Sequence, residues 1–191
     1  MSISYHILPA SALAKATRQQ CAKIALIILT HPSTSNSSAT TTSLLHSQWC
    51  EAVFGGRALE LAGRVVRPDY QGQGVATQML QELVQSERPQ FLTTYTRSPK
   101  ILRMVNRVSS ELYPIEDDAE LQTLASEMPF AETHEGIFYH INRYSDYEDG
   151  LFVGEDPASE PFKKNELPLK QQFDGLMDVR NALVVAARVR R

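Results

Sequence analysis

The segment from Arg57 to Val84 constrains the fold of this 191-residue chain more than any other, because three elements follow one another within it. Arg57 to Val66 is rich in apolar residues and is closed by Pro68, which predicts a strand that ends there. Thr77 to Val84 carries apolar residues at helical spacing, which predicts an amphipathic helix. A strand, a turn and a helix are therefore expected in that order.

The turn contains Gly72 and Gly74, with a single residue between the two glycines. Glycines at this spacing let the backbone approach a ligand closely and expose consecutive N–H groups. A helix that begins at the same point adds N–H groups without partners and the positive end of its dipole. We therefore expect this turn and the start of the helix to form a backbone cradle for a pyrophosphate.

Other interpretations of this turn compete with that one. A P-loop requires Gly-Lys followed by Ser or Thr, and no Gly-Lys pair occurs in the chain, so a P-loop is excluded. The dinucleotide fingerprint requires glycine or alanine at its sixth position, which is Thr77 when counted from Gly72, and no clear repeated βαβ units surround it. A plain glycine turn without a ligand stays open as an alternative.

The longer sequence around the turn resembles the acetyl-coenzyme A motif of the GNAT superfamily of N-acetyltransferases. That motif is Gln or Arg, two residues, Gly, one residue, and then Gly or Ala. The preceding Val66 to Tyr70 is similar to the end of the family's coenzyme strand, and the resemblance covers residues 59 to about 84. The residues that match the motif itself are Gln71, Gly72, Gln73, Gly74, Val75 and Ala76.

The resemblance implies both a fold and a cosubstrate. The implied fold is a single α/β (α+β) domain over residues 1–191, with a mixed, mostly antiparallel central sheet flanked by helices and a V-shaped splay at the coenzyme strand. The implied cosubstrate is acetyl-coenzyme A, without a metal, and the acceptor is an amine of a small molecule or a protein. Strand residues would bind the pantetheine arm and thioester through their backbone, with the Val66 N–H stabilising an oxyanion. The residues implied to bind the coenzyme are Arg64, Val65, Val66, Gln71, Gly72, Gln73, Gly74, Val75 and Ala76.

The implied reaction is direct attack of the amine on the thioester, which needs a base for the amine and an acid for the departing thiolate. Counting in steps of two places Glu60 on the strand face shared by Ala62, Arg64 and Val66, which makes Glu60 the candidate base. A surface carboxylate paired with a basic residue on the neighbouring strand is the alternative for Glu60.

The acid is the point at which the sequence departs from the family. Many GNAT relatives carry an asparagine after the fifth strand and a tyrosine on the next helix, but the corresponding positions here hold Ser98 and Val105. Valine cannot donate a proton. Tyr95 is the candidate acid and Tyr113 a second substitute, with ordinary packing as the alternative for each. The second hypothesis for the whole chain is therefore a GNAT-fold, acyl-coenzyme A-binding regulatory or interaction module that has lost catalysis.

The remaining elements are expected from local patterns. The expected helix at residues 12–29 contains Ile24, Ile27 and Ile28, which would also suit a strand. The other expectations are a strand at 3–9, a Ser/Thr-rich surface loop at 31–43, a strand at 91–96, a helix at 101–108 preceded by Ser98 and Pro99, a helix at 119–127, a strand at 136–144, an irregular acidic segment at 146–168 and a last strand at 181–188.

Composition excludes several classes of protein. The 19 basic and 22 acidic residues give a net charge of -3, which lacks the positive excess that nucleic-acid binding requires. The basic cluster at residues 188, 190 and 191 is interpreted as a solvated chain end. Cys21 and Cys50 lack the paired spacing of a zinc site. Because no apolar run approaches the roughly 20 residues of a bilayer span, we expect a cytoplasmic protein without a membrane partner. A homodimer is compatible with the sequence.

Overall fold

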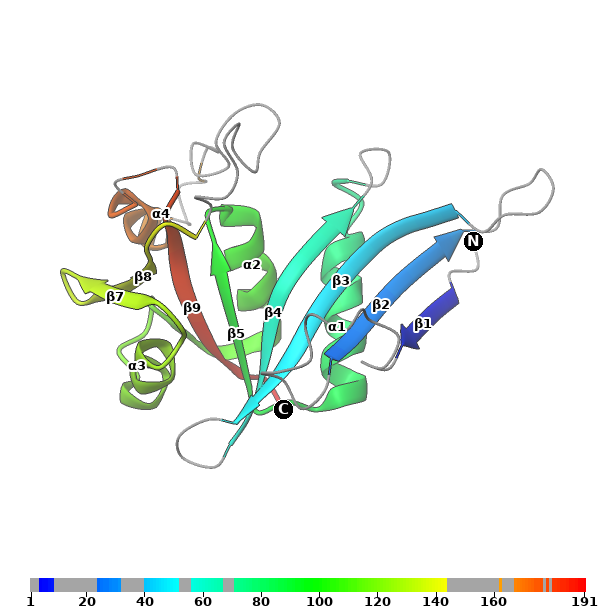
Figure 1. The fold of residues 1–191 in the computed structure, drawn as a ribbon, viewed down its shortest axis with the longest axis horizontal. Helices are drawn as coiled ribbons and strands as arrows, with labels where there is room; N and C mark the ends of the chain where they lie inside the picture. Colours follow the sequence, from blue (N-terminus) through cyan, green and yellow to red (C-terminus); the bar gives the residue numbers. More distant parts are fainter. Residues whose placement is uncertain are drawn as a thin grey trace. The chain divides into compact units, whose positions relative to one another are not determined.

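The computed structural model in Figure 1 describes residues 4–8, 24–31, 40–51, 56–66, 71–143, 162, 167–176, 178 and 180–191. The chain forms two compact units. The first unit contains the described residues up to Glu51 together with Arg57–Pro89. The second unit contains Gly56 and the described residues from Gln90 to Arg191. Each unit combines β-strands with α-helices.

The described part of the first unit holds four strands and one helix. Each strand pairs antiparallel with the next along the chain, in the order β1-β2-β3-β4. The helix α1 contacts β3 and β4 (Figure 1). The bounds of these elements are β1 Ser4–Leu8, β2 Ile24–His31, β3 Thr40–Glu51, β4 Arg57–Val66 and α1 Val75–Glu87.

Helix α1 forms because its apolar residues recur on one face. Met79, Leu80 and Leu83 are at most 1% exposed, whereas Gln78 and Gln81 are exposed. Burial of each such apolar side chain contributes roughly 1.5–3 kcal/mol. The helix ends at Glu87, and the N–H of its C-cap residue Arg88 donates to the Val84 carbonyl at 2.9 Å. The buried face therefore fixes the helix on the strands that it contacts.

The helix predicted for residues 12–29 is wrong where the structure describes that stretch, because Ile24–His31 forms β2. β-Branched side chains suit a pleated strand better than a helix, and here that preference prevails. The predicted loop at 31–43 is wrong at both ends, because His31 ends β2 and Thr40–Ser43 begin β3. Residues 12–23 and 32–39 of the two predictions lie outside the described residues.

The second unit is built around strand β9. Strand β9 pairs antiparallel with β5, β6 and β8, and β7 pairs antiparallel with β8. The bounds of its elements are β5 Phe91–Thr96, α2 Pro99–Val108, β6 Ser109–Tyr113, α3 Ala119–Ser126, β7 Ala131–His134, β8 Ile137–His140, α4 Leu167–Asp174 and β9 Ala182–Val189.

Strand β9 is buried because neighbours cover both of its edges and both of its faces. Residues Ala182–Ala187 are all 0% exposed, and such a continuous apolar run is typical of a strand buried on both faces. One edge pairs with β5, while β8 and β6 share the other, at its start and its end. The Tyr113 hydroxyl links these two strands, since it accepts the Phe138 N–H at 3.0 Å and donates to the Gly136 carbonyl at 3.3 Å.

The coarse fold class predicted from the sequence is confirmed, since the chain is an α/β protein with mostly antiparallel strands and flanking helices. The predictions of β4 and β5 match the observed bounds, and α2 begins at Pro99 with Ser98 as its N-cap. The strand predicted for 136–144 is shorter, and β7 was not predicted. The single domain over residues 1–191 and the splay at the coenzyme strand stay predictions.

The segment predicted to be irregular at residues 146–168 lies mostly outside the described residues, and α4 begins at its end, at Leu167. Within the part of the chain that the structure describes, none of the helices has the length and apolar character that a membrane span requires.

Candidate functional site

The glycine turn lies directly before α1, as the sequence predicts. Gly72 has φ 76° and Gly74 has φ 79°, both in the left-handed region that favours glycine, and Gly74 is the N-cap of the helix. A Cβ atom added at either glycine would meet no atom of the described residues within 4 Å. Residues 71–74 are exposed. The backbone conformation therefore keeps the turn open, and no side chain of the described residues fills the space beside its two glycines.

The first turn of α1 has the features of an anion site. The first helical hydrogen bond runs from the Gln78 N–H to the Gly74 carbonyl at 3.0 Å, so the N–H groups of Val75, Ala76 and Thr77 have no acceptor within the helix. No acidic residue stands in this turn of the helix. Within the described first turn the positive end of the helix dipole therefore meets no carboxylate, and the residues present fit a phosphate or pyrophosphate group.

Strand β4, which leads into the turn, contains a β-bulge at Ala62. Glu60 lies opposite Gln48 and Arg64 lies opposite Leu45, so four steps along β4 correspond to three steps along β3. Leu61 pairs with Ser47, and Gly63 pairs with the next residue of β3, His46. Ala62 is therefore the additional residue. Bulges re-aim a strand locally, and they occur often near functional sites.

The bulge overturns the predicted face of β4. Because residues of β3 alternate between faces, the register places Arg64 on the face opposite to that of Glu60. The same holds for Val66, which pairs with Ser43. The prediction that Glu60 shares one face with Arg64 and Val66 is therefore wrong, since the count in steps of two does not continue across an inserted residue.

Glu60 is buried, with 7% of its surface exposed. The alternative interpretation of Glu60 as a surface carboxylate is therefore wrong. A carboxylate is rarely buried to this extent unless other groups bind it. The role of Glu60 as a base stays a prediction.

Tyr95, the candidate acid, lies in the second unit, whereas Glu60 and the glycine turn lie in the first. The Tyr95 hydroxyl donates to the Pro129 carbonyl at 2.8 Å. Its ring meets the edge of the His140 ring at 4.7 Å between centroids, and the Arg143 guanidinium stands 5.5 Å from the ring centre. Since the hydroxyl proton is already in a hydrogen bond, Tyr95 would have to exchange that bond before it protonated a thiolate.

The two other positions weighed for the acid are parts of the core of the second unit. Val105 in α2 is 0% exposed, and Tyr113 is 2% exposed. Burial raises the pKa of Tyr113 above its ordinary value of 10.0, and the hydrogen bond from the Phe138 N–H lowers it only in part. A tyrosine that is buried and doubly hydrogen-bonded within the unit has a structural role.

Arg188 has partners that the sequence did not reveal. Its Nε lies 2.5 Å from Glu111 Oε2, and its Nη2 lies 3.0 Å from Asp118 Oδ2 and 2.7 Å from Glu120 Oε2. The guanidinium also stands 5.3 Å from the centre of the Phe91 ring. The prediction of a solvated chain end is therefore wrong for Arg188. Glu111 and Asp118 stand 77 and 70 positions away in sequence, so no local pattern could indicate them.

Arg97 is a second cation that the sequence left without a role. Its side chain is buried, and its Nη1 donates to the carbonyls of Asp178 at 2.6 Å and Asn181 at 2.8 Å. Buried charges need such partners because desolvation is costly. These bonds tie the end of β5 to the segment that precedes β9.

No group of three or more His, Cys, Asp or Glu residues that could hold a metal ion occurs among the described residues. Comparison with known protein families and with curated proteins finds no match to this chain. The fold and the site define an α/β protein in which two left-handed glycines stand directly before a helix N-terminus that carries no acidic residue.

Proposed function

We propose that this protein is an N-acetyltransferase of the GNAT type, which transfers an acetyl group from acetyl-coenzyme A to an amine. The observation that carries the proposal is the turn before α1, where Gly72 and Gly74 both have positive φ and open space beside them. The match of residues 71–76 to the GNAT motif supports the same conclusion.

In the proposed complex the coenzyme pyrophosphate binds to backbone N–H groups of residues 71–76, and the helix dipole of α1 adds to the attraction. Backbone groups of residues 64–66 at the end of β4 bind the pantetheine arm and the thioester. The Val66 N–H stabilises the oxyanion that forms on the thioester carbonyl.

The proposed reaction needs no covalent intermediate with the protein. The lone pair of a neutral amine attacks the thioester carbonyl, the C–N bond forms and the C–S bond breaks. The amine loses one proton to a base, and the coenzyme thiolate gains one from an acid. Glu60 and Tyr95 are the candidates for these two roles.

A second candidate function is an acyl-coenzyme A-binding module without catalysis. Two observations favour it: Val105 is fully buried where GNAT relatives carry the tyrosine, and the Tyr95 hydroxyl already donates to the Pro129 carbonyl. Both functions require the coenzyme cradle. They differ in whether an acceptor releases the thiol.

Binding to the cradle is tested by titrating the protein with acetyl-coenzyme A in a calorimeter, using Gly74→Glu and the matched control Gly136→Glu. Both glycines have positive φ, 79° and 81°, and both have open space beside them, so the two variants carry the same backbone strain. A carboxylate at the cradle repels the pyrophosphate and occupies its place. We expect Gly74→Glu to weaken binding by about 100-fold or more, the loss of two charge-assisted hydrogen bonds.

Gly136 lies in the β7–β8 turn of the second unit, so Gly136→Glu should bind as the unchanged protein does. Equal affinity of both variants for acetyl-coenzyme A, or no binding by the unchanged protein, would contradict the proposal. Enzyme and binding module are then separated by measuring free thiol during incubation with acetyl-coenzyme A and a library of amines. Thiol release that depends on the amine supports the enzyme, and binding without any release supports the module.

A further inference from the structure

The second unit contains a pocket of about 500 Å³ that the proposed coenzyme site does not use. The start of β5, the end of β9, β6, α3 and Gly56 contribute to its wall. Gly56 lies so close to Phe91, the first residue of β5, that a Cβ atom added at Gly56 would stand 2.6 Å from Phe91 Cε2. The volume falls within the range of small-molecule sites.

Two guanidinium groups line this pocket. Arg188 uses its Nε and Nη2 to bind carboxylates, and within the described part of the chain its Nη1 takes part in no hydrogen bond or ion pair. Arg191 is exposed and forms no ion pair with any described residue. Guanidinium N–H groups in this situation favour a carboxylate, which they bind in a bidentate manner.

Negative charge stands beside these cations. Glu120 lines the pocket, and its Oε2 lies 2.7 Å from Arg188 Nη2. Glu111 and Asp118 bind the same guanidinium. Three carboxylates around one arginine leave an excess of negative charge on this side, so a polyanion is repelled and an ammonium group is attracted.

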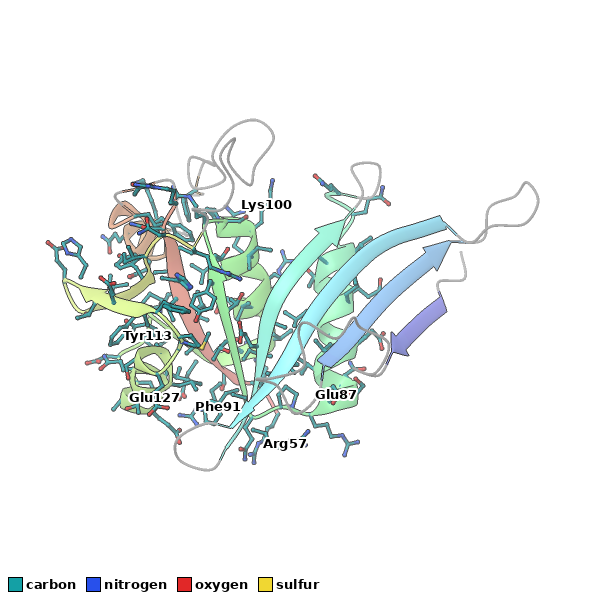
Figure 2. The ribbon with its side chains drawn as sticks, viewed as in Figure 1. Arg57, Glu87, Phe91, Lys100, Tyr113 and Glu127 are labelled. Carbon is teal, nitrogen blue, oxygen red and sulfur yellow. The ribbon has the colours of Figure 1, made fainter. Side chains whose placement is uncertain are left out.

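The rest of the wall is partly apolar. The Phe91 ring, labelled in Figure 2 at the start of β5, and the Val189 side chain both line the pocket. A ligand with a single charge would leave one of the two charged sides without a partner. A molecule with a carboxylate, an ammonium group and an apolar side chain meets a complementary group on each side.

We propose that this pocket binds a free α-amino acid with an apolar side chain. The carboxylate binds Arg191 and the Nη1 of Arg188, the ammonium group pairs with Glu120, and the apolar side chain packs against Phe91 and Val189. All of these residues belong to the second unit, so the site is independent of the coenzyme cradle in the first.

The test is calorimetric titration of the full chain, without acetyl-coenzyme A, with leucine and phenylalanine up to about 20 mM, where a millimolar Kd is measurable. N-acetyl-leucine, which lacks the ammonium group, and leucine methyl ester, which lacks the carboxylate, are titrated beside them. The variants are Arg191→Gln and Glu120→Gln, with Arg180→Gln as the matched control. Arg180 is an exposed arginine of the same unit that pairs with Asp178.

We expect both free amino acids to bind, and each blocked derivative to bind at least about tenfold more weakly, the loss of one charge-assisted pair. Arg191→Gln should weaken the binding of leucine and of N-acetyl-leucine but not the binding of leucine methyl ester. Glu120→Gln should weaken the binding of leucine and of leucine methyl ester but not the binding of N-acetyl-leucine. Arg180→Gln should change nothing.

Any of four results would overturn the assignment. They are the absence of binding by both free amino acids, equal binding of a blocked derivative, tighter binding of inorganic phosphate or citrate than of leucine, and an effect of Arg180→Gln as large as that of Arg191→Gln. The substitutions are at exposed or half-exposed side chains, and Glu120→Gln leaves Arg188 bound to Glu111 and Asp118, so the variants should fold.

Discussion

Replacing Arg188 by methionine removes the cation to which three carboxylates bind and keeps an apolar stem of similar length. The carboxylates come from β6, from the N-cap of α3 and from α3 itself, so Arg188 joins these elements to β9. Arg188→Met should therefore destabilise the second unit. It should do so through charge rather than through lost packing.

The magnitude follows from the exposure of the side chains. The four partners are between 20% and 44% exposed, so solvent screens each pair to about 0.2–1 kcal/mol. Three pairs and the lost cation–π contact with Phe91 together amount to about 1–4 kcal/mol at pH 7.

The effect should depend on pH in a defined direction. Burial alone would raise the pKa of Asp118, but hydrogen bonds from the Leu121 N–H and from Arg188 lower it below its ordinary value of 3.8. A carboxyl group whose folded pKa is lowered stabilises the protein above its unfolded pKa, and this contribution is lost as the pH falls through the folded pKa. The difference in unfolding free energy between the two proteins should therefore shrink below about pH 4.

Urea denaturation followed by far-ultraviolet circular dichroism, at pH 7 and at about pH 3.5, measures both effects. Arg180→Met is the matched control and should have a smaller effect, since Arg180 is more exposed and its one ion pair among the described residues is with Asp178. A loss at pH 7 below about 0.5 kcal/mol, or a loss that is the same at both pH values, would refute the reasoning.

Two further predictions concern the buried residues of the two units. Tyr113→Phe should cost about 1–3 kcal/mol, because the Phe138 N–H and the Gly136 carbonyl lose their partner. Because the folded pKa of Tyr113 is raised, its contribution to stability is lost as the pH rises through that pKa. Above pH 10 the unfolding free energy of the unchanged protein should therefore fall more steeply with pH than that of Tyr113→Phe. Parallel curves of unfolding free energy against pH would contradict this. Leu80→Ala should cost about 2–5 kcal/mol in thermal or urea unfolding, whereas the exposed Gln81→Ala should cost less than about 0.5 kcal/mol, and similar losses for the two would show that α1 is not anchored by its buried face.

The sequence predicts best where a local pattern and the tertiary environment agree. Strand β4, the glycine turn, α2 with Ser98 and Pro99 at its start, and β9 all have strong local signals that packing then satisfies. Strand β2 shows the opposite case. Alanine, lysine and arginine favour a helix in this stretch, but Ile27 and Ile28 pair with strands on both sides, and Ile24 pairs with Gln48 of β3. Pairing across the sheet is not visible in the local sequence.

The parts of the candidate site that the sequence could not predict depend on long-range contacts. The bond from Tyr95 to the Pro129 carbonyl joins residues 34 positions apart, and the bonds from Arg97 reach 81 and 84 positions along the chain. Strand β7 escaped prediction because Glu132, Thr133 and His134 are exposed, so they show no alternation of apolar and polar residues. Only the folded chain supplies such contacts.

The bulge at Ala62 divides β4 into two halves of opposite phase. From Arg57 to Leu61 the strand keeps one alternation, and from Gly63 to Val66 it keeps the other, each in register with β3. Deletion of Ala62 would therefore leave both halves in register with β3, because Leu61 and Gly63 already pair with the adjacent residues Ser47 and His46. Each remaining residue of β4 would keep its partner and its face, and only the local change of strand direction at the bulge would be lost. The inserted residue thus affects the course of the strand and leaves the pairing of its neighbours unchanged.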